Sequence, residues 1–99
     1  MKYEKYLLIK LAEEASEIAQ AAIKCSLFGY DSKDPRETDG DTNLFKLHKE
    51  MMDMTAVLTE LAETESFNNP NEDFDADKYI ESKQKKLNYY YGIASNQTS

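Results

Sequence analysis

Residues 7–25 read LLIKLAEEASEIAQAAIKC, and apolar side chains recur along them at spacings of three and four. This spacing is the period of one face of an α-helix. Because neither Gly nor Pro occurs over 3–28, the sequence predicts one long helix there, which Gly29 ends in a left-handed conformation. The apolar face comprises Leu7, Leu11, Ala15, Ile18, Ala22 and Cys25, and a second stripe beside it comprises Leu8, Ala12, Ala19 and Ile23. Two adjoining stripes predict packing against more than one neighbour.

The rest of the chain predicts two further helices, over 43–65 and 76–91. The first carries the stripe Leu44, Leu47, Met51, Met54, Thr55, Leu58 and Leu61 or Ala62. Asp41 or Asn43 is expected to cap it, and Asp75 to cap the C-terminal helix, whose apolar stripe is thinner. The segments 29–42 and 66–75 are rich in turn-forming residues and are predicted to be loops.

The fold class that follows is all-α, in a single domain over 1–99. Neither alternating apolar runs nor hairpin signals compete with the helical periodicity. Two long antiparallel helices and a shorter C-terminal one leave wide apolar faces for one small chain to cover. Self-association into a homodimer or homotetramer with a four-helix-bundle core is the expected way to bury them.

Composition excludes several function classes. The 99 residues contain 12 Lys and Arg against 19 Asp and Glu, a net charge of −7. An acidic balance argues against nucleic-acid and anionic-membrane partners, which require a basic face. One cysteine fits a reducing compartment, and neither a signal peptide nor a membrane-spanning run is recognisable. The sequence therefore predicts a cytoplasmic protein.

Two acidic pairs border the apolar faces of the two long helices. Glu14 and Glu17 lie three residues apart on one helix, and Glu50 and Asp53 lie three residues apart on the next. If the helices pack antiparallel, the four carboxylates converge.

Two like charges about 4 Å apart repel by roughly 4 kcal/mol at an effective dielectric near 20, so such a cluster needs protons or a cation. Oxygen ligands alone select Mg²⁺, with Mn²⁺ as a possible substitute.

A structural interpretation competes with this one. Two acids at this spacing on a helix usually lie on a solvent-exposed face and bind nothing. The metal-site hypothesis is favoured only because two such pairs occur, each beside an apolar stripe. A di-iron site of the ferritin type is disfavoured, because it needs Glu-x-x-His on two helices and the single histidine, His48, does not fit.

The motif Glu13-Glu14-x-x-Glu17 followed by Glu50-x-x-Asp53 resembles the signature of the all-α NTP pyrophosphatase superfamily, the MazG-like nucleoside triphosphate pyrophosphohydrolases of short phage and bacterial type. Residues 6–14, Lys24 through Gly29, Asn43 and the segment from Lys83 to Leu87 are also similar to such members, so the resemblance covers roughly 3–91. The stretch 18–49 is somewhat long for the family.

The resemblance implies Mg²⁺-dependent hydrolysis of a nucleoside triphosphate, usually a deoxy form, to the monophosphate and pyrophosphate, by water attack at the α-phosphorus. It implies that Glu14, Glu17, Glu50 and Asp53 hold the metal. Glu13 matches the first acid of the motif and is a further catalytic candidate, which either orients the attacking water or supports the metal ligands. Which acid is the general base stays open. Lys24, Lys83 and Lys86 are candidates for phosphate binding, against solvation as surface lysines. Asn43 and Phe28 are weaker candidates for base or sugar contacts, against helix capping and packing.

Two other functions stay open. One is a non-catalytic acidic helical oligomer that binds a protein partner through its apolar stripes. The other is a pyrophosphohydrolase of a different nucleotide, such as a phosphoribosyl nucleotide.

Overall fold

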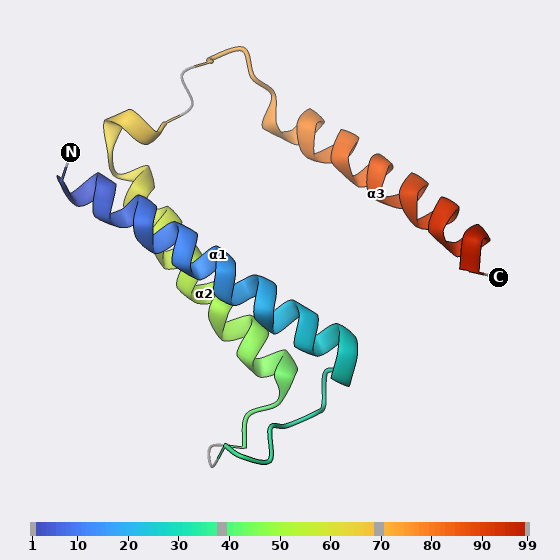
Figure 1. Cartoon of the computed structure of the whole chain (residues 1–99). Helices are drawn as coiled ribbons and strands as arrows, with labels where there is room; N and C mark the ends of the chain where they lie inside the picture. The colour runs from blue at the N-terminus through green and yellow to red at the C-terminus, as the bar shows by residue number, and fades with distance from the viewer. Residues whose placement is uncertain (1, 38–39, 69–70, 99) are drawn as a thin grey trace. The chain divides into compact units, whose positions relative to one another are not determined.

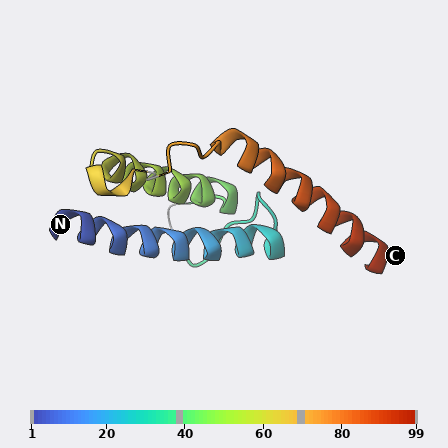
Figure 2. The same ribbon diagram turned by 90° about the horizontal axis from the view of Figure 1, so that it is seen from above.

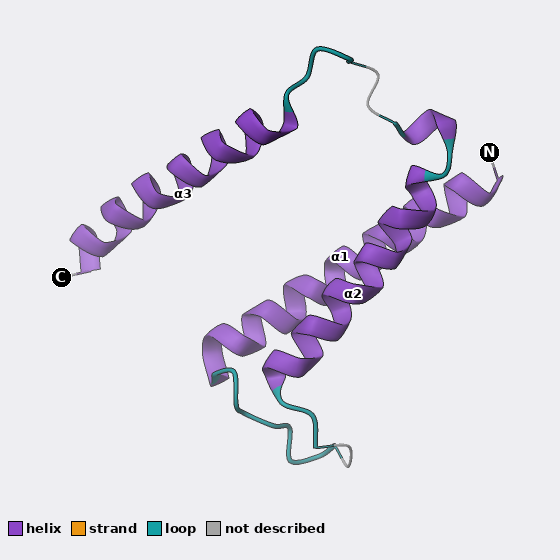
Figure 3. Ribbon diagram, turned by 180° about the vertical axis from the view of Figure 1, so that it is seen from behind, coloured by secondary structure: helices purple, strands orange, loops and turns teal. Residues whose placement is uncertain are grey.

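A computed structural model describes residues 2–37, 40–68 and 71–98, and over these ranges the chain is helical (Figure 1). The elements are α1 (Lys2–Phe28), α2 (Asn43–Ala62), the short 3-10 helix η1 (Glu65–Phe67) and α3 (Ala76–Thr98). Within these ranges there is no strand, only an isolated bridge between Lys33 and Thr42 (Figure 3). The all-α class predicted from the sequence is therefore confirmed.

The chain divides into two compact units, Met1–Asn68 and Asn69–Ser99. The first contains α1, α2 and η1. The second contains α3, where Asp75 Oδ1 accepts a hydrogen bond of 3.1 Å from the Lys78 N–H, the predicted cap. The ring of Phe74 packs against that of Tyr79, with centroids 5.5 Å apart. Within the described ranges, no helix combines the length and hydropathy of a membrane-spanning segment.

The helix ends differ from the prediction at two places. Gly29 ends α1 with a φ of 92°, as expected. By contrast, α2 ends at Ala62, before the predicted end near Glu65, and the chain continues through η1. Beyond its predicted end at Tyr91, α3 continues through Gly92 to Thr98. A single glycine costs a helix only about 1 kcal/mol, and no proline follows to stop it.

Thr42, and neither of the two predicted residues, caps the start of α2. Its Oγ1 accepts a hydrogen bond of 3.1 Å from the Phe45 N–H. Asn43 is instead buried, and its Nδ2 donates to the carbonyl of Gly29 at 3.3 Å. The Asn43 amide thereby connects the end of α1 to the start of α2.

The helices α1 and α2 form an antiparallel pair, seen side by side in two views (Figures 1 and 2). At the end opposite Asn43, the Tyr3 hydroxyl donates to Glu60 Oε2 at 2.9 Å. Close by, the Thr64 hydroxyl donates to Glu4 Oε1 at 3.2 Å. The start of α1 thus contacts the end of α2, which gives the antiparallel arrangement that the sequence predicts.

Buried and half-buried side chains follow an alternating spacing of three and four along both helices, the heptad spacing of coiled-coil interfaces. We call this set the α1–α2 interface. It comprises Leu7, Leu11, Glu14, Ile18, Ala21 and Cys25 of α1, and Asn43, Leu47, Glu50, Met54, Val57 and Leu61 of α2. Glu14 and Glu50 therefore occupy interface positions rather than the border where the sequence pattern put them.

The α1–α2 interface is rotated around each helix relative to the apolar stripe predicted from the sequence. Ala15 and Ala22 of the predicted α1 stripe are exposed, as are Met51 and Leu58 of the predicted α2 stripe. The reason is geometric: the apolar residues span a wider arc than one neighbouring helix covers. Part of each stripe is consequently left on the surface of the chain.

Candidate metal centre

Three carboxylates meet at the middle of the α1–α2 interface. Glu14 of α1 and Glu50 and Asp53 of α2 each offer one oxygen, and these oxygens all lie within 4.8 Å of one another. The i,i+3 spacing of Glu50 and Asp53 puts both on the side of α2 that faces α1. Residues far apart in sequence are thus brought together by the antiparallel packing.

Two oxygens of this cluster are buried and without a hydrogen-bond partner among the residues described, namely Oε2 of Glu14 and Oε2 of Glu50. Leaving a buried polar atom unsatisfied costs free energy, and more so when the group is charged. An interface that otherwise consists mainly of apolar residues therefore concentrates acceptors for a cation or a proton at its centre.

The electrostatics point the same way. Hydrogen bonding with the Glu17 carboxyl, burial, and the charges of Glu17, Asp53 and Glu14 raise the pKa of Glu50 from its ordinary 4.5 to about 7. Burial, followed by the charges of Glu17 and Asp53, raises the pKa of Glu14. The raised pKa of Glu50 favours retention of a proton on this carboxyl in the metal-free protein.

The remaining two acids of the motif differ in position. Glu17 is exposed, yet it interacts with both Glu14 and Glu50 and lies at the edge of the cluster. Glu13 is exposed and accepts a hydrogen bond of 3.0 Å from Lys10 Nζ. Four of the five predicted acids therefore converge, whereas Glu13 engages a lysine on its own helix.

The donor set fits Mg²⁺. The cluster consists of carboxylates alone, which are the hard ligands that Mg²⁺ and Mn²⁺ prefer over zinc or copper. A divalent ion would satisfy the two buried oxygens and neutralise the mutual repulsion of the acids. The residues that would hold it are Glu14, Glu50 and Asp53, with Glu17 beside them.

Comparisons of the chain with family models, curated proteins and solved structures found no match.

A pocket of about 130 Å³ opens beside the acids. Glu17 and Glu50 line it together with Lys24, Asn43 and Lys46. The last three residues also line a larger neighbouring pocket of about 320 Å³, a volume typical of small-ligand sites. The carboxylate cluster therefore borders a pocket of the same unit.

Three residues predicted from the sequence reach these pockets. Lys24 and Asn43 line both of them, and Phe28 lines the larger one. Lys83 and Lys86 are exposed residues of α3 in the second unit. Neither is among the residues that line the two pockets of the first unit.

Sequence reasoning missed Lys46, Lys33 and Arg36, all of which line the larger pocket. The sequence could have predicted the position of Lys46, because this residue precedes Glu50 by four positions and thus lies on the same face of α2. Lys33 and Arg36 belong to the loop between α1 and α2, where helical periodicity gives no information about position.

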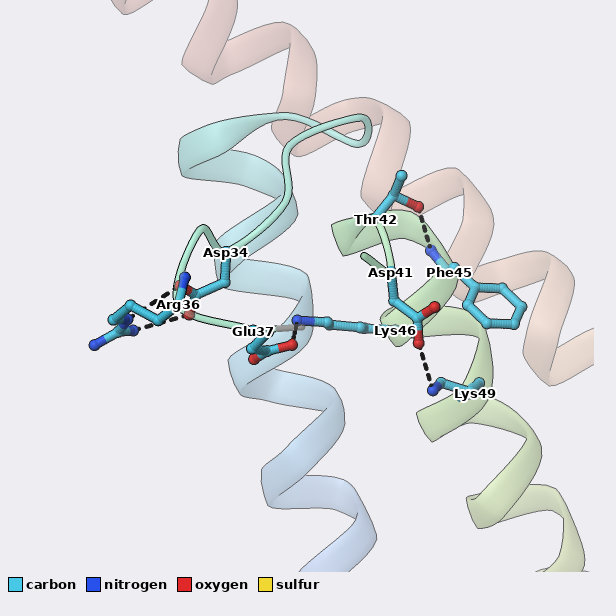
Figure 4. Close-up of polar contacts among 8 residues, drawn as sticks. All are labelled: Asp34, Arg36, Glu37, Asp41, Thr42, Phe45, Lys46 and Lys49. Carbon is cyan, nitrogen blue, oxygen red and sulfur yellow. Dashed lines mark hydrogen bonds and ion pairs between the residues drawn. The ribbon is translucent and has the colours of Figure 1, made fainter. Parts of the chain in front are cut away.

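Ion pairs organise this loop (Figure 4). Arg36 donates two hydrogen bonds to Asp34, from Nε at 3.0 Å and Nη2 at 2.9 Å, which hold the pKa of Asp34 well below its usual range. Glu37 pairs with Lys46 of α2. Asp41 pairs with Lys49 of α2, with Oδ2 2.8 Å from Nζ. Two loop carboxylates are thus connected to two successive lysines on α2.

Proposed function

We propose that this protein is a Mg²⁺-dependent nucleoside triphosphate pyrophosphohydrolase, which hydrolyses a (d)NTP to the (d)NMP and pyrophosphate. The observation that carries the proposal is the pair of buried, unsatisfied oxygens of Glu14 and Glu50, contributed by opposite helices. The pockets lined by lysines beside these oxygens and the resemblance of the acidic motif to MazG-like enzymes support the same activity.

Glu14, Glu50 and Asp53 hold Mg²⁺ in this proposal, and Glu17 completes the acidic wall. When bound, the ion would neutralise the negative charge that develops on the phosphate oxygens as water displaces pyrophosphate from the α-phosphorus. Lys24 binds a phosphate group from the pocket side, and one of the four carboxylates accepts the proton of the water that attacks the α-phosphorus. Lys83 and Lys86 are retained as further phosphate-binding candidates, and Asn43 and Phe28 as base or sugar contacts.

The decisive experiment assays a panel of ribo- and deoxyribonucleoside triphosphates for pyrophosphate, with and without Mg²⁺. We expect release of pyrophosphate only with the metal. Glu50→Gln and Asp53→Asn should each lower turnover by about 100-fold or more while the helical circular dichroism is retained. Glu81→Gln, which removes the same charge from α3, is the matched control. Release of inorganic phosphate, or full activity in both cluster variants, would refute the proposal.

We include self-association in the proposal. Large apolar side chains of α1 and α2 remain exposed in the single chain, among them Leu8, Ile23, Met51 and Leu58. A second copy that covers them would complete a four-helix core and give a homodimer or homotetramer. Light scattering should show such a mass, and Leu8→Glu or Leu58→Glu should lower it; a monomeric wild-type protein contradicts this part.

The same exposed apolar residues favour a second candidate function, a non-catalytic module that binds a protein partner. It predicts neither pyrophosphate release nor a response to Mg²⁺. If a phosphoribosyl nucleotide is cleaved and the common triphosphates are not, the substrate assignment changes but the carboxylate chemistry does not.

We also propose a cytoplasmic localisation, which the single cysteine favours.

A further inference from the structure

The larger pocket is positively charged, although the chain is strongly acidic. Four cationic side chains line it, those of Lys24, Lys33, Arg36 and Lys46. Among its lining residues Asp34 is the one acid, and its ion pair with Arg36 leaves the three lysines in excess. In a chain with a net charge of −7, this concentration of cations marks the place where an anion is attracted.

Lys46 has a special position within this arrangement. It lines both pockets and lies one helical turn from Glu50, so it is adjacent to the carboxylate cluster as well as to the cationic cavity. Its ammonium group forms an ion pair with the carboxylate of Glu37, which comes from the loop between α1 and α2 (Figure 4). An anionic group of the protein itself is therefore bound at the lysine that joins the two pockets.

We propose that Lys46 is a phosphate-binding residue of this site and that Glu37 is an intramolecular competitor, whose carboxylate a phosphate group of the substrate replaces. The identification of that phosphate as part of a nucleoside triphosphate rests on the proposed function. Replacement exchanges one anion for another at the same ammonium group and requires neither proton transfer nor a change in covalent structure.

Two physical reasons favour the exchange. A polyphosphate carries more negative charge than one carboxylate, and Lys24 lines the same two pockets, so a bound polyphosphate interacts with two lysines. The Glu37 side chain is 41% exposed and the Lys46 side chain 21%, so water reaches the carboxylate of the pair, and ion pairs that water reaches are weak.

The chain offers a matched control for this proposal. Asp41 and Lys49 form a second ion pair between the same loop and the same helix. Lys49 is not among the described residues that line either pocket. Loss of the Asp41–Lys49 pair therefore removes an ion pair between the loop and α2 without removing a lysine of either pocket, whereas loss of the Glu37–Lys46 pair also changes access to the phosphate-binding lysine.

The test measures binding of inorganic pyrophosphate by calorimetry at saturating Mg²⁺, a readout that needs no turnover. Glu37→Gln should tighten binding by about two- to fivefold, because competition is removed. Lys46→Gln should weaken binding by about tenfold or more, and the double variant should match Lys46→Gln. Asp41→Asn and Lys49→Gln should bind like the wild type.

The outcomes separate this inference from the proposed function. If Glu37→Gln and Asp41→Asn have equal effects, or if Lys46→Gln binds normally, the inference is overturned even in an active enzyme. If the variants behave as expected and no nucleoside triphosphate is hydrolysed, Lys46 and Glu37 keep their assignment as an anion site, and the pyrophosphohydrolase proposal is the one that fails.

Discussion

Glu14 and Glu50 meet across the α1–α2 interface with carboxylate oxygens within 4.8 Å of each other, and one oxygen of each is buried without a hydrogen-bond partner within the described part of the chain. Heptad positions at the centre of a helix pair are normally apolar. Two acids at such positions lower the stability of the metal-free protein, and this instability is the basis for the next two predictions.

The metal-free protein should lose stability between pH 5 and pH 8. The pKa of Glu50 is about 7 in the folded chain against an ordinary value of 4.5, so the folded state binds this proton more tightly than the unfolded state. The stability that protonated Glu50 contributes is full below about pH 4.5 and is lost as the pH rises through 7. The raised pKa of Glu14 acts in the same direction.

Thermal denaturation in a chelator, followed by circular dichroism at several pH values, measures this loss. Glu50→Gln cannot ionise, so its melting temperature should vary less with pH and should exceed that of the wild type at pH 8. The lowered pKa of Asp34 acts in the opposite direction, and only as the pH falls below its ordinary 3.8, outside this window. An unchanged pH slope in Glu50→Gln would remove Glu50 as the cause.

Magnesium should stabilise the folded protein. A ligand at ten times its dissociation constant contributes about 1.4 kcal/mol, which corresponds to roughly 5–10 °C in the melting temperature of a domain this small. Glu14→Gln and Asp53→Asn should each abolish most of the shift, because each removes an oxygen of the cluster. Sodium chloride at matched ionic strength is the control, and an equal shift with this salt would indicate screening instead of a site.

Lys24→Gln should raise the KM for a triphosphate about tenfold or more with a smaller effect on kcat, since a lysine that binds phosphate throughout the reaction contributes mainly to substrate affinity. Lys24 lines both pockets. Steady-state kinetics of pyrophosphate release measures the change. The alternative, a solvated lysine near the end of α1, predicts an unaltered KM.

Asn43→Ala should destabilise the fold by about 1 kcal/mol, because it removes the hydrogen bond that the buried Asn43 amide donates to the Gly29 carbonyl. Urea denaturation measures the loss. Thr42→Ala, which removes the helix cap, should cost about 1 kcal/mol and provides a comparison at the neighbouring position. Wild-type stability in Asn43→Ala would contradict a structural role for this hydrogen bond.

Much of the fold was predictable because it depends on local physics. Uninterrupted apolar periodicity over 3–28 gave α1, the glycine after Phe28 ended it, and Asp75 capped α3 as expected. The continuation of α3 past Gly92 was not predicted, since one glycine weakens a helix without setting its end.

The candidate site also has features that local sequence predicts and features that it does not. The spacing of Glu14 and Glu17, and of Glu50 and Asp53, is local, and it sufficed to predict that the acids would converge. Lys46 and Glu37 could not be paired from the sequence, because their contact depends on the path of a loop rather than on a repeating pattern.

The order of residues along the chain suffices to predict amphipathic helices with four acids near their apolar faces, because helix formation and side-chain direction follow from residues three and four positions apart. Which part of each wide apolar arc faces the other helix depends on how the two helices pack. That rotation moved Glu14 and Glu50 from the border to the centre of the interface, where removal from water changes their ionisation and makes a cation the natural complement.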